Sequence, residues 1–118
     1  MELRTRHYND IAIFSVNGRL DANTVSPFMQ GIEDQVGAGY GRLVIDLKKV
    51  DFLSSAGIKA LVQAVQLSRQ HGGDVRLANA RGRVKYVLNL AGIDSIIKVY
   101  PNVVSATASF FPGPLPGK

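Results

Sequence analysis

The hydrophobic pattern of the chain changes repeatedly between a period of two residues, which predicts strands, and a period near 3.6 residues, which predicts helices. In order, it predicts two strands, a helix, and then three strands that are each followed by a helix. The predicted strands are 3–7, 11–17, 43–47, 74–78 and 96–99, and the predicted helices are 25–36, 58–70, 84–91 and one that opens at Pro101 or Asn102 and reaches Phe110 or Phe111.

Strands that alternate with helices predict an α/β fold with a mainly parallel sheet and right-handed crossovers. We expect a single domain with a mixed five-stranded sheet and about four helices, in which the first strand is an antiparallel edge. The strand 11–17 is apolar on both faces, which indicates that both are covered. The domain is expected to span residues 1–110, followed by a flexible Pro/Gly-rich tail at 111–118.

Composition narrows the class of protein. The 118 residues are 46% hydrophobic and 19% charged, which is typical of a globular chain. There is no cysteine, so disulfides and thiolate metal sites are excluded. No apolar run approaches the ~20 residues that cross a bilayer, and the N-terminal residues lack the apolar core of a signal peptide. We therefore expect a cytoplasmic protein that does not bind membranes.

The net charge of +5 is spread along the chain, with one basic cluster at 81–85. A nucleic-acid-binding surface needs a broader patch or a reading motif, with aromatic side chains interleaved where single strands are bound. The cluster is therefore interpreted as a solvated helix start, and no direct contact with nucleic acid is expected. The more modest inference is a preference for a protein partner with an acidic surface.

Catalysis is also unsupported by the sequence. A serine nucleophile needs a base within hydrogen-bond reach, and the only histidines are His7 and His71. His71 would lie about four helical turns, roughly 24 Å, from Ser55. Two distant histidines and dispersed carboxylates do not form a metal site. We expect no enzymatic activity, no cofactor and no metal ion.

The stretch 50–58 links the strand 43–47 to the next helix and contains two adjacent hydroxyls, Ser54 and Ser55. Either serine can cap the helix, because its oxygen can accept a free N–H of the first turn. The helix N-terminus also carries a partial positive charge that tolerates a phosphate. Two interpretations follow from the residues alone: the serines only cap a helix, or one of them accepts a phosphate.

The segment Leu43-Val44-Ile45-Asp46-Leu47-Lys48-Lys49-Val50-Asp51-Phe52-Leu53-Ser54-Ser55-Ala56-Gly57-Ile58 resembles the signature of the STAS family of bacterial anti-sigma factor antagonists. The resemblance implies that Ser55, two places before the glycine, is the phosphorylated serine. Ser54 stands where the best-known members have an acidic residue. The element Gly18-Arg19-Leu20-Asp21 is similar to a family element beside the acceptor, which implies that Asp21 is a neighbour of the site. With 84–93 and Val99-Tyr100-Pro101, the resemblance covers about residues 1–110.

The helix after Ser55 has apolar and small residues on different faces. Ile58, Leu61, Val62 and Val65 are expected to form its core stripe. A small-residue strip is expected to project outward, where another backbone could approach closely; it consists of Ala56, Ala60, Ala64 and Leu67. The alternative is that these alanines only reflect helix propensity.

Two functions remain open. The resemblance implies an anti-sigma factor antagonist that binds an anti-sigma factor, itself a serine kinase, until phosphorylation of Ser55 releases it. The alternative is a non-switched STAS scaffold or an accessory subunit of a transporter or stressosome-like complex. A weak homodimer is left open. The predicted partner contacts are Asp21, Ser54, Ser55, Ala56, Gly57, Ala60, Ala64 and Leu67.

Overall fold

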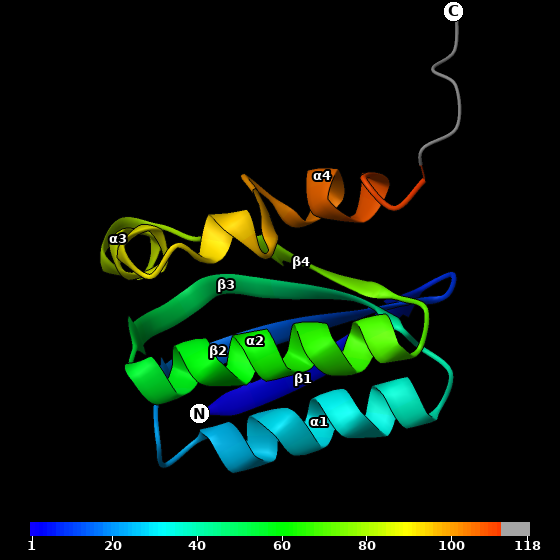
Figure 1. Ribbon diagram of the computed structural model, residues 1–118, viewed down its shortest axis with the longest axis horizontal. Coiled ribbons are helices and arrows are strands. Elements are labelled where there is room, and N and C mark those ends of the chain that lie inside the picture. Colours follow the sequence, from blue (N-terminus) through cyan, green and yellow to red (C-terminus); the bar gives the residue numbers. More distant parts are fainter. Residues whose placement is uncertain (112–118) are drawn as a thin grey trace, which may run out of the picture.

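A computed structural model describes residues 1–111 of the chain (Figure 1). All predicted elements are present, in the predicted order. The strands are β1 (Glu2–Tyr8), β2 (Ile11–Leu20), β3 (Arg42–Leu53), β4 (Asp74–Ala78) and β5 (Lys98–Tyr100). The helices are α1 (Val25–Gly37), α2 (Ser55–Gln70), α3 (Gly82–Leu90) and α4 (Val103–Ala108), with a short 3-10 turn at Ile93–Ser95.

The five strands form one sheet in the order β1-β2-β3-β4-β5. β1 pairs antiparallel with β2, and all other neighbours are parallel, which confirms the predicted mixed sheet with an antiparallel edge. Because the strand order follows the sequence, right-handed crossovers place every connecting helix on the same face. The carboxyl ends of β2 and β3 therefore meet at one edge of the sheet, directly before α1 and α2.

The two faces of the sheet bury separate cores. The larger core packs α1, α2 and α3 against one face, with Phe14 and Leu61 among its fully buried side chains. The smaller core packs α4 against the other face and includes Ile13 and Phe110. β2 contributes to both cores, as its doubly apolar pattern predicts. Figure 1 shows α1 and α2 side by side on one side of the strands and α4 on the opposite side.

The segment 17–21 differs from its prediction. Its Asn-Gly pair predicts a turn that leads into a helix, but residues 17–20 continue β2 and pair with the end of β3, up to Leu20 beside Leu53. The ladder shifts register on both sides of Gly18, whose φ is 108°. The glycine therefore accommodates an irregularity within the strand rather than a turn.

Among residues 1–111, no helix is both long enough and apolar enough to cross a membrane. The expected flexible tail lies almost wholly outside the described residues, which end at Phe111. The division of the chain at residue 110 stays a prediction.

Candidate functional site

The junction between β3 and α2 assigns different roles to the two adjacent serines. Ser54 is the N-cap residue of α2, in an extended conformation, and its Oγ accepts a hydrogen bond from the Gly57 N–H at 3.3 Å. Ser55 is the first residue of the helix proper, and its side chain is exposed. In the described part of the chain, no hydrogen bond engages the Ser55 hydroxyl. Of the two serines, the structural cap is therefore Ser54, which leaves the Ser55 hydroxyl available.

The start of α2 favours negative charge. The first turn of an α-helix has N–H groups without an intrahelical acceptor and carries the positive end of the helix dipole. α2 is 16 residues long, and its first turn contains no acidic side chain. A carboxylate that would compete with a phosphate on Ser55 is thus absent from this turn. The local electrostatics suit a phosphoserine at this position.

The end of β2 lies against the same turn. The Ser54 N–H donates to the Leu20 carbonyl oxygen at 3.1 Å. Gly57 also packs against this carbonyl, so closely that a Cβ atom on Gly57 would collide with it. Gly57 is therefore required by a close approach of two backbones. These contacts bring Leu20, the residue before Asp21, beside Ser54, which is the neighbour of Ser55 in the chain.

Asp21 stabilises the loop between β2 and α1 rather than capping the helix, whose N-cap is Thr24. Its carboxylate accepts hydrogen bonds from the Asn23 N–H at 3.0 Å and from the Arg19 guanidinium at 3.2 Å. The Asn23 N–H lowers the pKa of Asp21, and the Arg19 guanidinium adds to that effect against a smaller opposing effect of burial. Arg19 in turn lies 4.1 Å from the ring centroid of Phe52 on β3. The loop is thus tied to both strand ends.

The small-residue strip does not project outward, so that prediction is wrong for Ala60 and Ala64. Their exposed fractions are 2% and 0%, and both belong to the larger core. The buried face of α2 consists of Gly57, Ala60, Leu61, Ala64, Val65 and Ser68, which recur at helical spacing. Small side chains occupy the centre of this face, which packs into the larger core against the chain's own sheet. Ile58 and Val62, expected at the centre of the core, are only partly buried at its margin.

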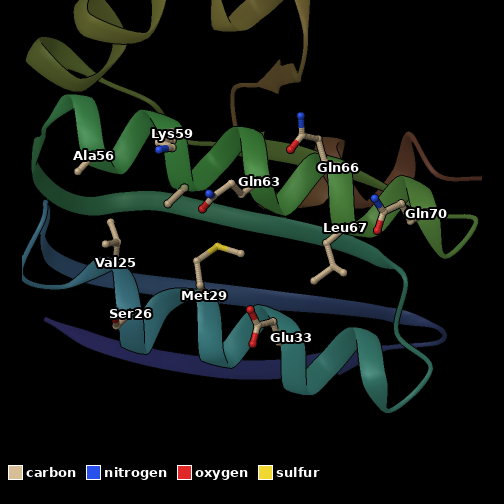
Figure 2. Close-up of a pocket in the computed structure, with 11 residues that line it drawn as sticks. Val25, Ser26, Met29, Glu33, Ala56, Lys59, Gln63, Gln66, Leu67 and Gln70 are labelled. Carbon is tan, nitrogen blue, oxygen red and sulfur yellow. The ribbon is translucent and has the colours of Figure 1, made fainter.

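An open groove runs between α1 and α2, starting beside Ser55, with a volume of about 600 Å³. Figure 2 shows the two helices facing each other across it. It is lined by Val25, Ser26, Met29 and Glu33 of α1 and by Ala56, Lys59, Ala60, Gln63, Gln66, Leu67 and Gln70 of α2. Among residues 1–111, the only charged residues that line it are Lys59 and Glu33, and exposed glutamines line its α2 side.

The structure brings together most of the predicted site residues. Asp21 and 54–57 meet at the carboxyl ends of β2 and β3, and Leu67 lines the groove further along α2. Ala64 is set apart, because a fully buried methyl group offers no surface to a partner. The sequence analysis missed the contribution of α1, because Met29 lies at helical spacing from Val25 and Ile32 and so looks like a core residue. In the structure it is only partly buried, at the margin of the larger core.

The histidines lie away from Ser55. His7 pairs in register with Ala12 near the start of β2 and contacts Gln35 through its Nε2. His71 follows the last residue of α2. Within residues 1–111, no three carboxylates or histidines are grouped as a metal site would require. The chemistry available at the site is that of a serine hydroxyl at a helix start beside a groove.

Comparison with known proteins identifies the family. Residues 2–106 match the STAS domain, so the chain belongs to the STAS domain family. It is 31% identical over 101 residues to the anti-sigma-F factor antagonist RsfB of Mycobacterium tuberculosis, covering 84% of this chain and 80% of that protein. It is 22% identical over 107 residues to the anti-sigma F factor antagonist of Paenibacillus polymyxa, covering 90% and 92%.

The fold also matches a solved anti-sigma factor antagonist. The unphosphorylated form of SpoIIAA superposes with a TM-score of 0.81 at 14% identity, over 97% of this chain and 100% of that one. Its phosphorylated form, from Bacillus, gives a TM-score of 0.72 at 13% identity, over 92% and 99%. At these identities the match shows the fold alone, and it confirms the single five-stranded α/β domain.

Proposed function

We propose that this protein is an anti-sigma factor antagonist that binds an anti-sigma factor with serine kinase activity and is released when that kinase phosphorylates Ser55. The observation that carries the proposal is that the two adjacent serines at the start of α2 have different roles. Ser54 supplies the cap, while the exposed Ser55 is the next residue and adjoins the α1–α2 groove at Ala56. The relatives named anti-sigma factor antagonists support the proposed class of protein.

The physical basis of the switch is a change of charge on an otherwise intact surface. A phosphate adds about −1.5 to −2 charges at neutral pH. The helix dipole favours this charge within the free protein, so the fold is retained. A partner that covers Ser55 would have to strip water from the phosphate, which is costly without a matching cation. Phosphorylation thus weakens the complex without unfolding the domain.

The contact surface follows from the same geometry. The partner is proposed to rest on the loop at Asp21, on residues 54–57 and on the groove between α1 and α2. Ala60 and Leu67 contribute as groove walls, and Ala64 supports the helix from beneath. Three glutamines, one lysine and one glutamate line the groove. This composition favours a hydrogen-bonded interface over a strongly charged one. The interaction would take place in the cytoplasm, where sigma factors act.

The decisive experiment incubates the protein with a serine-kinase anti-sigma factor and ATP and follows intact mass. The wild type should gain the mass of one phosphate, Ser55→Ala should gain none, and Ser54→Ala should still be modified. Calorimetric titration should show that Ser55→Ala keeps its affinity for the kinase and that Ser55→Glu loses it. Phosphate on Ser54, or unchanged binding of Ser55→Glu, would contradict the proposal. Stable binding without any phosphorylation would indicate the scaffold alternative.

A further inference from the structure

A basic cavity lies at the end of the sheet opposite Ser55, where β3, β4 and β5 begin. Its volume is about 390 Å³, and its lining includes Arg42, Asp74, Arg76, Lys98, Ser109 and the Phe110 ring. Arg42, Asp74 and Lys98 are the first residues of their strands. β3 has 12 residues, so Ser55 is roughly 40 Å away at about 3.3 Å per residue. The cavity is therefore separate from the proposed partner site.

Arg76 is held rigidly in the wall of this cavity. Its Nη1 donates to Asp74 Oδ2 at 2.8 Å, and its Nε donates to Ser109 Oγ at 3.0 Å. The guanidinium carbon lies 4.3 Å from the centroid of the Phe110 ring, and only 11% of the side chain is exposed. Folding has therefore already restricted the Arg76 side chain, so a ligand that binds it would cost little further side-chain entropy.

Arg42 approaches the same aromatic ring. Its guanidinium carbon lies 5.8 Å from the Phe110 centroid, and its Nη1 donates to the Phe110 carbonyl oxygen at 3.4 Å. Its nearest carboxylate, on Asp10, is 3.9 Å away, at the limit of an ion pair, and 40% of the Arg42 side chain is exposed. Arg42 therefore lies at the cavity, and its guanidinium group has further N–H donors with which it could bind a ligand.

Lys98 makes the charge distribution unfavourable without a ligand. It lies directly opposite Arg76 in the β4–β5 register, so two cations face each other on the same side of the sheet. Like charges in this arrangement destabilise a sheet. Over residues 1–111, Lys98 forms no ion pair, and Asp74 is already shared by Arg69 and Arg76.

The lining carries three positive charges and one negative charge, a net charge of +2. The negative charge is persistent. Burial raises the pKa of Asp74, but the hydrogen bond from the Val75 N–H and the guanidinium groups of Arg76 and Arg69 outweigh it, so the pKa lies below its ordinary value. Asp74 thus stays ionised at neutral pH and orients Arg76, and it does not cancel the cationic excess.

We propose that this cavity binds a phosphate group, either as free phosphate or as the phosphate of a small ester such as a nucleoside monophosphate. A phosphate dianion matches the net charge and relieves the repulsion between Arg76 and Lys98. Arginine recognises phosphate through paired N–H donors, and lysine adds a point charge. The cavity is more than tenfold larger than the ~30 Å³ that one water occupies in the liquid, so it also admits a group attached to the phosphate.

The test is a titration of the ¹⁵N-labelled protein followed by NMR, with sodium phosphate, with AMP, and with sodium chloride at matched ionic strength. Phosphate should produce saturable shifts of the Gly73, Arg76, Lys98 and Ser109 amides that chloride does not reproduce. Lys98→Gln and Arg42→Gln should each raise the phosphate Kd about fivefold. Lys48→Gln, which removes an exposed lysine outside the cavity, should leave it unchanged.

The titrations with AMP, phosphate and chloride distinguish the possible ligands. Tighter binding of AMP than of phosphate assigns a phosphate ester as the ligand, and equal or weaker binding of AMP assigns free phosphate. Shifts that chloride reproduces, or that Lys98→Gln and Lys48→Gln alter equally, would overturn the proposal by showing general screening of charge. The absence of saturable shifts with either phosphate compound would overturn it as well. Spectra of each variant without ligand verify that the fold is retained.

Discussion

The main-chain N–H of Ser54 donates to the carbonyl oxygen of Leu20 at 3.1 Å, and this bond fixes the start of α2 against the end of β2. Gly57 contacts the same carbonyl and has no space for a Cβ atom. We expect Gly57→Ala to lower the free energy of unfolding by about 1–3 kcal/mol, because backbone atoms must move to relieve the collision. Urea denaturation measures this change.

Gly37 provides the matched control for that substitution. It is the last residue of α1, and a Cβ atom there meets nothing within 4 Å. Gly37→Ala should be neutral or stabilise the protein by up to about 1 kcal/mol, because alanine loses less conformational entropy in a helix than glycine does. Equal effects at the two positions would contradict a specific contact at Gly57.

The two adjacent serines should separate in their effects on stability. Ser54→Ala removes the oxygen that accepts the Gly57 N–H, and loss of such a cap costs about 1 kcal/mol. Ser55→Ala removes an exposed hydroxyl and should change the free energy of unfolding by less than about 0.5 kcal/mol. Chemical denaturation of both variants checks this. A larger loss for Ser55→Ala would identify Ser55 as the structural cap.

Burial of Ala64 gives a prediction about α2. Ala64→Arg places a charge at a fully buried position, and an uncompensated buried charge destabilises a protein by about 3–5 kcal/mol. We expect a large drop in melting temperature by circular dichroism. Gln63→Arg, at the adjacent exposed position, should leave the melting temperature nearly unchanged. A soluble, fully folded Ala64→Arg variant would contradict the packing described for this helix.

Much of the fold was predictable from hydrophobic spacing, because most of the predicted elements, apart from the edge strands β1 and β5, bury the apolar residues that define their spacing. The turn between β3 and α2 was predictable too, although the residues alone left open which serine caps the helix. The orientation of α2 was not. Its stripe was centred on the large residues Ile58 and Val62, but close packing places Ala60 and Ala64 at the centre. Spacing gives a helical stripe only to within about one residue, or 100° of rotation, and the closeness of the sheet decides the rest.

The groove should contribute to partner binding through Lys59, which lines its α2 side. Lys59→Glu reverses a charge at the rim of the proposed interface, and we expect about tenfold weaker binding of the kinase, since rim charges act mainly on association. Lys48→Glu makes the same change of charge outside the groove. Surface plasmon resonance should find normal binding by Lys48→Glu. Equal losses in both variants would indicate a general effect of net charge.

The ion pairs of Asp74 predict a dependence of stability on pH. The pKa of Asp74 lies below its ordinary value, so its contribution is present above the unfolded pKa of about 3.9 and is lost as pH falls through the folded pKa. Asp74→Asn should lower the free energy of unfolding by about 1 kcal/mol at pH 7. The gap to the wild type should narrow below about pH 4. Urea denaturation at pH 7, 5 and 3 measures the gap.

Asp94→Asn is the control for that pH series. Asp94 lies in the short turn after α3 and takes no part in the ion pairs of the described chain. Its variant should follow the wild type at every pH. A gap for Asp74→Asn that stays constant from pH 7 to pH 3 would show that its effect is steric rather than electrostatic.

The sequential strand order has a consequence for synthesis on the ribosome. Every segment of the proposed partner site lies within residues 1–70, which end with α2. β4, which pairs with β3, ends at Ala78, so eight more residues must be made before it is complete. At about 5–20 residues per second this takes roughly 0.4–1.6 s. Until then β3, later a central strand, is an open edge, and the stretch that β4 will cover contains Leu43, Val44 and Ile45. Unpaired edges of this kind favour aggregation, so the nascent chain is most vulnerable just before β4 pairs with β3.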